Sequence, residues 1–256
     1  MTLLSIQNVS LNFGGLKALN GASFDVARGT LTGLIGPNGA GKTTLFNCIS
    51  GLYQPTDGTI AFGGKAITGL PPEKVTASGL IRTFQLARGF PRMSVFDHLL
   101  LYGQHQPGES ILSGLIGSTA ARQRESALHD KAWTIVKRLK LERIVNHFPG
   151  NVSGGQKKLL EIGRALMTDP QMLLLDEPMA GVNPTLVNEI GDHLLALKEE
   201  GITILLIEHD MPLIRRLCDE VVVMAEGAFM ARGKFDDIAS DPRVQEAYLG
   251  VTRPCA

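Results

Sequence analysis

The feature that most constrains this chain is a glycine-rich segment, GPNGAGKTT at residues 36–44, between an apolar stretch and a helix-forming stretch. It fits the pattern G-x-x-x-x-G-K-[ST], which requires a buried strand, a tight loop and then a helix. In such a loop the backbone N–H groups surround phosphate oxygens, and the helix contributes its positive N-terminus. The segment therefore predicts an α/β core that binds a nucleotide.

Each position of this loop has an expected task. Lys42 can reach the β- and γ-phosphates, and the hydroxyl of Thr43 can ligate Mg²⁺. The alternative is a glycine turn followed by an ordinary surface lysine. The strand before the loop and the helix after it favour the phosphate loop over this alternative. The predicted phosphate-binding residues are Gly36, Pro37, Asn38, Gly39, Ala40, Gly41, Lys42, Thr43 and Thr44.

A second feature is an apolar stretch that ends in two acids, MLLLDE at residues 172–177. A buried parallel strand of this kind delivers Asp176 and Glu177 to the carboxyl edge of the sheet, where ligands of such folds bind. Asp176 suits a Mg²⁺ shell, and Glu177 can polarise a water molecule. In isolation the pair could equally be two solvated acids, but beside a phosphate loop the catalytic interpretation is favoured.

A third feature is VSGGQ at residues 152–156, which opens a helical stretch. A serine followed by two glycines at a helix start can form an anion cradle. Because the chain already has one phosphate loop, a second cradle needs a reason, and one solution is that it serves a nucleotide held by another subunit. The other interpretation is a simply capped helix, and spacing alone favours that one.

Strand and helix stretches alternate along most of the chain, interrupted by a block from about residue 88 to 168 in which only helical periodicity is visible. That block contains a stretch rich in Gly, Ser and Pro at residues 103–119, interpreted as an insert. The strands are expected at residues 3–9, 22–26, 31–35, 59–62, 79–84, 172–175, 202–207 and 220–224, and the helices at 42–50, 94–101, 120–141, 155–167, 184–200, 212–217 and 243–249.

Composition excludes several classes of protein. Lys plus Arg and Asp plus Glu both number 25, so the formal net charge is zero. A protein that binds nucleic acid through its overall positive charge is therefore not expected. Its longest apolar runs are far shorter than the roughly 20 residues that cross a bilayer, so any membrane role is expected to be peripheral. The three cysteines form no disulfide framework, which indicates a reducing compartment, and the first residues do not resemble a secretory signal.

Taken in order, GPNGAGKTT, Gln85, VSGGQ, MLLLDE and His209 resemble the ATP-binding subunit of an ABC transporter over essentially the whole chain. The resemblance implies a P-loop ABC ATPase core with an antiparallel β subdomain, at residues 1–87 and 169–256. It also implies a helical subdomain at residues 88–168, which carries the insert and the signature motif. ATP and Mg²⁺ are the implied cofactors.

The resemblance also assigns residues to roles. Two ATPase subunits would face each other head to tail, and Ser153, Gly154, Gly155 and Gln156 would contact the γ-phosphate bound by the partner. Phe13 would stack on adenine. The implied catalytic residues are Glu177, His209 and Gln85, and the implied metal ligands are Thr43, Gln85 and Asp176.

Three positions depart from the patterns. Val152 stands where leucine is usual, and Asn183 stands where many members have aspartate in the loop that crosses the dimer interface. Gly154 stands where the ATPases of branched-chain amino acid importers, one group within this family, often have tyrosine. Asn183 keeps the capacity for hydrogen bonds but loses the charge.

A narrower resemblance, to the branched-chain amino acid importer ATPases, rests on FGGLKAL, the insert, DEPMAGVNP, IEHDM and EAYLG. It implies two transmembrane permease subunits, a second ATPase subunit that is identical or different, and a separate substrate-binding protein. The chain would be peripheral, at the cytoplasmic face of the inner membrane. The same subunit of a urea or amide importer remains the alternative, since such systems share most of these motifs.

Two other classes of protein fit the sequence less well. A soluble ABC-type mechanoenzyme acting on nucleic acid or ribosomes usually has two cassettes or a long coiled-coil insertion, whereas this chain has one cassette and a short insert. A P-loop kinase or GTPase would leave VSGGQ and His209 unexplained, and the guanine-reading NKxD motif is absent. No nucleic-acid partner is expected.

Overall fold

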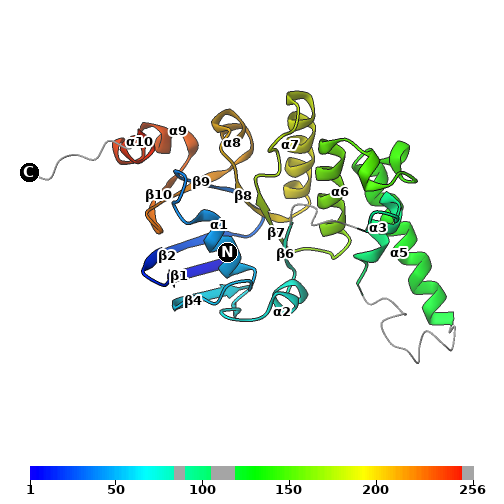
Figure 1. Ribbon diagram of the computed structural model, residues 1–256, viewed down its shortest axis with the longest axis horizontal. Helices are drawn as coiled ribbons and strands as arrows, with labels where there is room; N and C mark the ends of the chain where they lie inside the picture. The colour runs from blue at the N-terminus through cyan, green and yellow to red at the C-terminus, as the bar shows by residue number, and fades with distance from the viewer. Residues whose placement is uncertain (84–89, 105–118, 250–256) are drawn as a thin grey trace, which may run out of the picture. The chain divides into compact units, whose positions relative to one another are not determined.

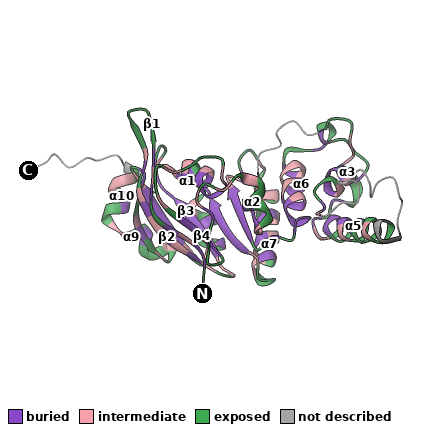
Figure 2. Cartoon of the chain, turned by 90° about the horizontal axis from the view of Figure 1, so that it is seen from below, coloured by how far each residue is buried: buried purple, intermediate pink, exposed green. Residues whose placement is uncertain are grey.

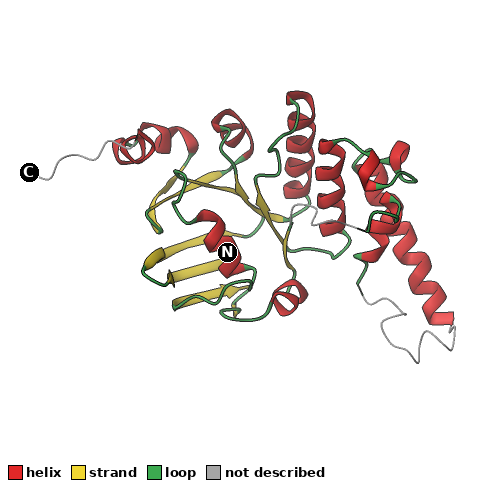
Figure 3. Cartoon of the chain, viewed as in Figure 1, coloured by secondary structure: helices red, strands yellow, loops and turns green. Residues whose placement is uncertain are grey.

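The computed structural model describes residues 1–83, 90–104 and 119–249 and divides the chain into two compact units (Figure 1). The first comprises Met1–Arg82, Gln171–Pro178 and Gly191–Ala256; the second comprises Thr83–Pro170 and Met179–Ile190. The first contains one antiparallel and one mainly parallel sheet, and the second is helical (Figure 3). The predicted α/β fold class is confirmed.

The antiparallel sheet has four strands in the order β2-β1-β4-β5. Two of these strands are longer than predicted, because the hairpin pairing continues up to Phe13 and Leu16 on either side of a two-glycine turn. Backbone hydrogen bonds thus extend the strands beyond the stretch of alternating apolar residues. The strands are β1 (Thr2–Phe13), β2 (Leu16–Ala27), β4 (Asp57–Phe62) and β5 (Lys65–Ala66).

The second sheet has six strands in the order β10-β9-β3-β8-β7-β6, all parallel to their neighbours except β10. Its central strands β3 and β8 are buried at every position rather than at alternate ones, as expected for a sheet covered on both faces. The strands are β3 (Leu31–Ile35), β6 (Leu80–Arg82), β7 (Met172–Asp176), β8 (Thr203–Ile207), β9 (Glu220–Ala225) and β10 (Ala228–Gly233).

Helix α1 (Lys42–Ile49) lies in the core shared by the two sheets. Its buried residues, among them Leu45, Phe46 and Ile49, belong to the same cluster as buried residues of both sheets. Figure 2 shows the buried parts of the chain in purple. The helix is short, so this packing stabilises it more than its intrinsic propensity does. The strand–loop–helix context required by the glycine-rich segment is therefore confirmed.

The remaining helices of the first unit include one that the sequence analysis missed, α2 (Pro72–Ala77), a six-residue helix with proline in its first turn. The tail after Gly227 forms a strand and helices, as predicted. Those helices are α9 (Phe235–Ser240) and α10 (Pro242–Leu249), and α8 (Met211–Leu217) precedes them.

The helical unit contains α3 (Val95–Leu101), which Ser94 caps as predicted, through a capping box with Asp97. Helix α5 ends at Arg138 rather than at the predicted residue 141, because Lys140 takes a left-handed conformation with φ 53°. The other elements are α5 (Thr119–Arg138), α6 (Gly154–Leu166), α7 (Pro184–Glu199), which runs from this unit into the first, and the 3₁₀ turns η2 (Glu142–Ile144) and η3 (Pro149–Asn151).

Most of the predicted insert, residues 105–118, lies outside the described residues. Among the described residues, none of the helices has the length and apolar character that crossing a membrane requires.

Candidate functional site

The phosphate loop follows β3 directly and depends on glycine at its first position. Gly36 has φ 151°, and a Cβ atom there would lie 2.1 Å from the carbonyl oxygen of Met224 on the neighbouring strand β9. No side chain fits at that distance. The loop can therefore leave the sheet edge only if residue 36 is glycine. Packing thus gives a second reason for the first glycine of the motif, beside its expected contact with phosphate.

Lys42, the first residue of α1, is held inside this loop. Its ammonium group donates hydrogen bonds to the carbonyl oxygens of Gly36, at 2.8 Å, and Pro37, at 3.0 Å. Burial lowers the pKa of Lys42, and the charges of Glu177 and Asp176 oppose that shift. A buried cation beside backbone N–H groups is the arrangement that a phosphate chain requires.

Glu177 and His209 meet at the carboxyl edge of the parallel sheet. Asp176, the last residue of β7, pairs in register with Ile207, the last residue of β8. Glu177 turns away from the strand direction with φ 48°, and its N–H donates to the Ile207 carbonyl oxygen at 3.0 Å. As a result His209 Nε2 lies 2.8 Å from Glu177 Oε1. An ionised carboxylate can only accept, so Nε2 carries the proton of this bond.

The left-handed backbone of Glu177 is uncommon for a residue with a side chain and costs about 1 kcal/mol or more. Both side chains of the pair remain 43% exposed, so a water molecule can reach them. Two residues that the sequence analysis singled out separately therefore form one hydrogen-bonded pair, open to solvent.

The candidate metal ligands supply oxygen donors only. Asp176 accepts a hydrogen bond from Arg82 through Oδ2, and a carboxylate has a second oxygen to offer a cation. Thr43 is exposed at the start of α1. In the described parts of the chain, no group of three or more His, Cys, Asp or Glu has a geometry that could hold a metal ion by itself. This donor set suits Mg²⁺, which keeps several waters and takes few protein ligands beside substrate phosphates.

Gln85, the other expected metal ligand and catalytic residue, lies outside the described residues.

Phe13 lies at the end of β1 and is 46% exposed. Its ring meets that of Tyr53 edge to face, with the ring centroids 5.4 Å apart and the planes at 79°. The sequence analysis missed Tyr53, which carries no local signal. An exposed aromatic ring that a second ring holds in place is suited to stacking on a base.

Replacing Phe13 with alanine should weaken ATP binding by about 1 kcal/mol, or about fivefold in Kd, because only stacking is lost. ATP and GTP should be affected alike, since a ring face reads no base edge. Phe148→Ala provides a matched control, because Phe148 is equally exposed, at 45%, but belongs to the helical unit. Calorimetry should detect no loss in that control; equal losses in both variants would remove Phe13 from the site.

The signature segment lies in the helical unit, where Ser153 caps α6. The Gln156 N–H donates to Ser153 Oγ at 3.3 Å, and the Ser153 N–H donates to Gln156 Oε1 at 2.9 Å. The capped-helix interpretation is therefore confirmed, and Ser153 and Gly154 are also exposed. A hydroxyl that accepts one bond can still donate another, so the cap does not exclude a phosphate contact.

A side chain at residue 155 would have to displace Leu186 within the helical unit. A Cβ atom there would lie 1.7 Å from Cδ2 of Leu186, on the first turn of α7. The two departures nearby are both accommodated: Val152 is buried, and the Asn183 side chain accepts a hydrogen bond from the Leu186 N–H at 3.0 Å, which caps α7.

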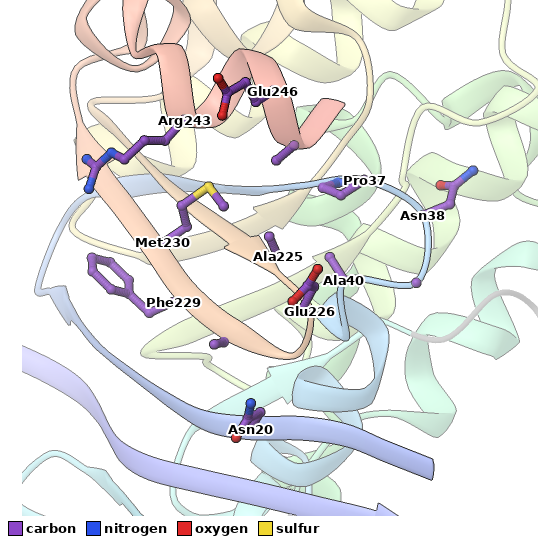
Figure 4. A pocket seen from close by; sticks show the side chains of 13 residues that line it. Asn20, Pro37, Asn38, Ala40, Ala225, Glu226, Phe229, Met230, Arg243 and Glu246 are labelled. Carbon is purple, nitrogen blue, oxygen red and sulfur yellow. The ribbon is translucent and has the colours of Figure 1, made fainter. Parts of the chain in front are cut away.

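A cavity of about 750 Å³ adjoins the phosphate loop on the side of the C-terminal helix (Figure 4). Pro37–Ala40 form one wall, and Phe229 and Met230 of β10 with Arg243 and Glu246 of α10 form others. Among the described residues that line it there is neither a candidate catalytic residue nor a metal ligand. We therefore separate this cavity from the hydrolytic site.

Helix α10 nevertheless packs against the base of the loop. Val244 is buried in a cluster with Ile35, the residue before the loop. Burial raises the pKa of Tyr248, and a hydrogen bond from the Gly36 backbone partly offsets that rise. A helix at residues 243–249 was predicted from the sequence, but its contact with the phosphate loop was not.

Comparisons with known proteins match two parts of the chain to known families. The ABC transporter family matches residues 19–180, and the family described as branched-chain amino acid ATP-binding cassette transporter matches residues 230–253. The second match covers β10, α9 and α10.

Two curated relatives carry the name of branched-chain amino acid transport ATP-binding protein LivG. One, from Archaeoglobus fulgidus, is 40% identical over 98% of this chain and 96% of its own. The other, from Salmonella typhimurium, is 39% identical over 97% of this chain and 98% of its own. A solved structure, the ADP conformation of an ATP-binding cassette of an ABC transporter, is 41% identical with a TM-score of 0.84, and the match covers 98% of this chain and all of that one.

Because the ABC transporter family matches residues 19–180 and identities near 40% extend over nearly the whole length of this chain and its relatives, the chain belongs to the LivG family of branched-chain amino acid transport ATP-binding proteins and is an ATP-hydrolysing ABC cassette.

Proposed function

We propose that this ABC ATPase hydrolyses ATP through Glu177 and that hydrolysis powers the import of branched-chain amino acids. The observation that carries the proposal is the 2.8 Å pair of Glu177 and His209 at the sheet edge. The charge of Glu177 opposes the lowering of the Lys42 pKa by burial, which supports a role for the pair beside the phosphate loop. A carboxylate near bound phosphates can take the proton of an attacking water.

In this mechanism Lys42 and the loop N–H groups bind the β- and γ-phosphates. Glu177 accepts a proton from water as the water oxygen bonds to the γ-phosphorus. The bond between that phosphorus and the bridging oxygen breaks, and ADP leaves with phosphate. His209 holds the Glu177 carboxylate in place by its hydrogen bond. Bound Mg²⁺, held by Thr43 and Asp176 with Gln85, would supply charge neutralisation at the phosphates.

The signature segment would complete the site of a second ATPase subunit, identical or different. Ser153 and Gly154 are exposed at the N-terminus of a 13-residue helix, where an anion is favoured. A γ-phosphate bound by the partner's loop is the anion that this arrangement would contact in a head-to-tail dimer.

Ser153→Arg should leave ATP binding to the single subunit unchanged and abolish turnover in the assembled transporter, because the arginine occupies the space of the partner's γ-phosphate. The matched control is Ser94→Arg, since Ser94 caps α3 through the same capping box. Each variant should lose about 1 kcal/mol of stability with its cap. Phosphate release should fall only in Ser153→Arg; equal turnover in both variants would leave Ser153 as a cap alone.

The helical unit is the part that we propose meets the two permease subunits. It exposes several aromatic side chains, among them Phe90, Trp133 and Phe148. Exposed aromatic rings are enriched at protein interfaces. The chain would thus be peripheral, at the cytoplasmic face of the inner membrane, and a separate binding protein would deliver the substrate.

The amino-acid assignment can be tested against its alternative, a urea or amide importer. The transporter is reconstituted with its permeases and binding protein, and phosphate release is measured with leucine, isoleucine or valine and, separately, with urea. We expect stimulation by the branched-chain amino acids. Stimulation by urea alone would favour the alternative while leaving the ATPase assignment in place.

A further inference from the structure

Arg82 connects the two elements that carry the candidate metal ligands. It is the last residue of β6, and its side chain is only 7% exposed. Its Nη2 donates to Asp176 Oδ2 at 3.0 Å, across to the end of the neighbouring strand β7. The same guanidinium therefore reaches a residue that the Mg²⁺ site requires.

The other side of the guanidinium faces α1, the helix that begins with Lys42 and Thr43. Nη1 donates to the side-chain oxygen of Asn47 and, at 3.4 Å, to Ser50 Oγ. The guanidinium carbon lies 5.7 Å from the centre of the Phe46 ring. One planar group thus contacts α1 and the end of β7 at once, which its fixed fork of donors allows and a lysine would not.

We propose that Arg82 is a positioning residue for the Mg²⁺–nucleotide site, which it aligns by fixing the Asp176 carboxylate relative to α1. The proposal rests on the proposed function, since it assumes that Asp176 and Thr43 serve Mg²⁺. Thr43 and Asp176 come from different elements, and their relative placement determines whether one cation can use both. Groups that orient metal ligands in this way typically change metal affinity about 10- to 100-fold when replaced.

Arg82 is not assigned a contact with the nucleotide. Its buried side chain is turned toward Asp176, Asn47 and Phe46 rather than toward solvent. Its effect should therefore appear in the dependence of nucleotide binding on Mg²⁺, and not in nucleotide binding without the metal.

The test measures binding of an ATP analogue with a nitrogen bridge between the β- and γ-phosphates, by calorimetry on the full chain in the assembled transporter. Arg82→Met and Arg82→Lys are compared with the wild type, in EDTA and across a Mg²⁺ titration. In Arg82→Met we expect unchanged affinity in EDTA and a half-saturating Mg²⁺ concentration raised about 10- to 100-fold. Arg82→Lys should be intermediate, because an ammonium can pair with Asp176 but cannot also reach α1.

Arg232→Met is the matched control for simple loss of an ion pair. Arg232 binds Glu220 through two nitrogens, at 2.8 and 2.6 Å, on β10 and β9 at the opposite end of the same sheet. It should lower Tm without changing the Mg²⁺ response. Should Arg82→Met fail to fold, Asn47→Ala removes one of the hydrogen bonds between Arg82 and the α1 side and should shift the Mg²⁺ response in the same direction by a smaller factor.

The results distinguish the positioning role of Arg82 from the proposed function. A wild-type Mg²⁺ response in folded Arg82→Met, or in Asn47→Ala if only that variant folds, would overturn the role of Arg82 and leave the proposed function intact. A wild-type protein whose nucleotide binding does not respond to Mg²⁺ would overturn both.

Discussion

Exchanging Glu177 for glutamine should lower ATP turnover about 10²- to 10⁴-fold, the usual contribution of a general base. The amide matches the carboxylate in size but cannot take a proton from water. ATP binding should persist, since the phosphates are held by the loop and Lys42. Phosphate release from the assembled transporter measures turnover, and calorimetry measures binding.

The control is Glu199→Gln, the same chemical change on the exposed last turn of α7. It should retain wild-type turnover. If Glu177→Gln turned over ATP as fast as this control, Glu177 would not be the general base. Its hydrogen bond to His209 would then have no role in catalysis by that route.

Removing the ammonium of Lys42 should have the second largest effect, on binding rather than on chemistry. A charged hydrogen bond contributes about 1.5–3 kcal/mol, so Lys42→Ala should weaken ATP affinity about 10- to 100-fold. The loop carbonyl oxygens of Gly36 and Pro37 would lose their donor too, which adds to the loss of order in the loop.

Lys74→Ala, on the exposed face of α2, changes the same residue type away from the loop and should bind ATP normally. Calorimetry on both variants provides the comparison. Unchanged affinity in Lys42→Ala would mean that the glycine-rich segment is not the phosphate site.

The parts of the site that follow local chain geometry could be predicted from the sequence. A loop between a buried strand and a helix predicts the placement of Lys42, and an apolar strand ending in two acids predicts the placement of Asp176. The pairing of Glu177 with His209 depends on the register of β7 and β8, in which Asp176 lies opposite Ile207. Periodicity identifies strands but not which residues of two strands lie opposite each other.

Contacts between segments far apart in the chain could not be predicted, because no local sequence pattern indicates them. Tyr53 against Phe13 and α10 against the phosphate loop join residues far apart in the chain. Arg82 is a clearer case, since a charged residue at a strand end usually faces solvent, and only the structure places it between α1 and Asp176. Strand lengths were also underestimated, because backbone pairing in the β1–β2 hairpin does not require alternating apolar residues.

Hydrolysis at Glu177 is expected to drive amino-acid import. The most direct measurement is ATP-dependent uptake of labelled leucine by proteoliposomes that contain the assembled transporter, recorded together with phosphate release. With wild-type protein both should occur, and with Glu177→Gln both should stop while Glu199→Gln retains both. Undiminished leucine uptake by Glu177→Gln would mean that hydrolysis at this carboxylate does not drive import.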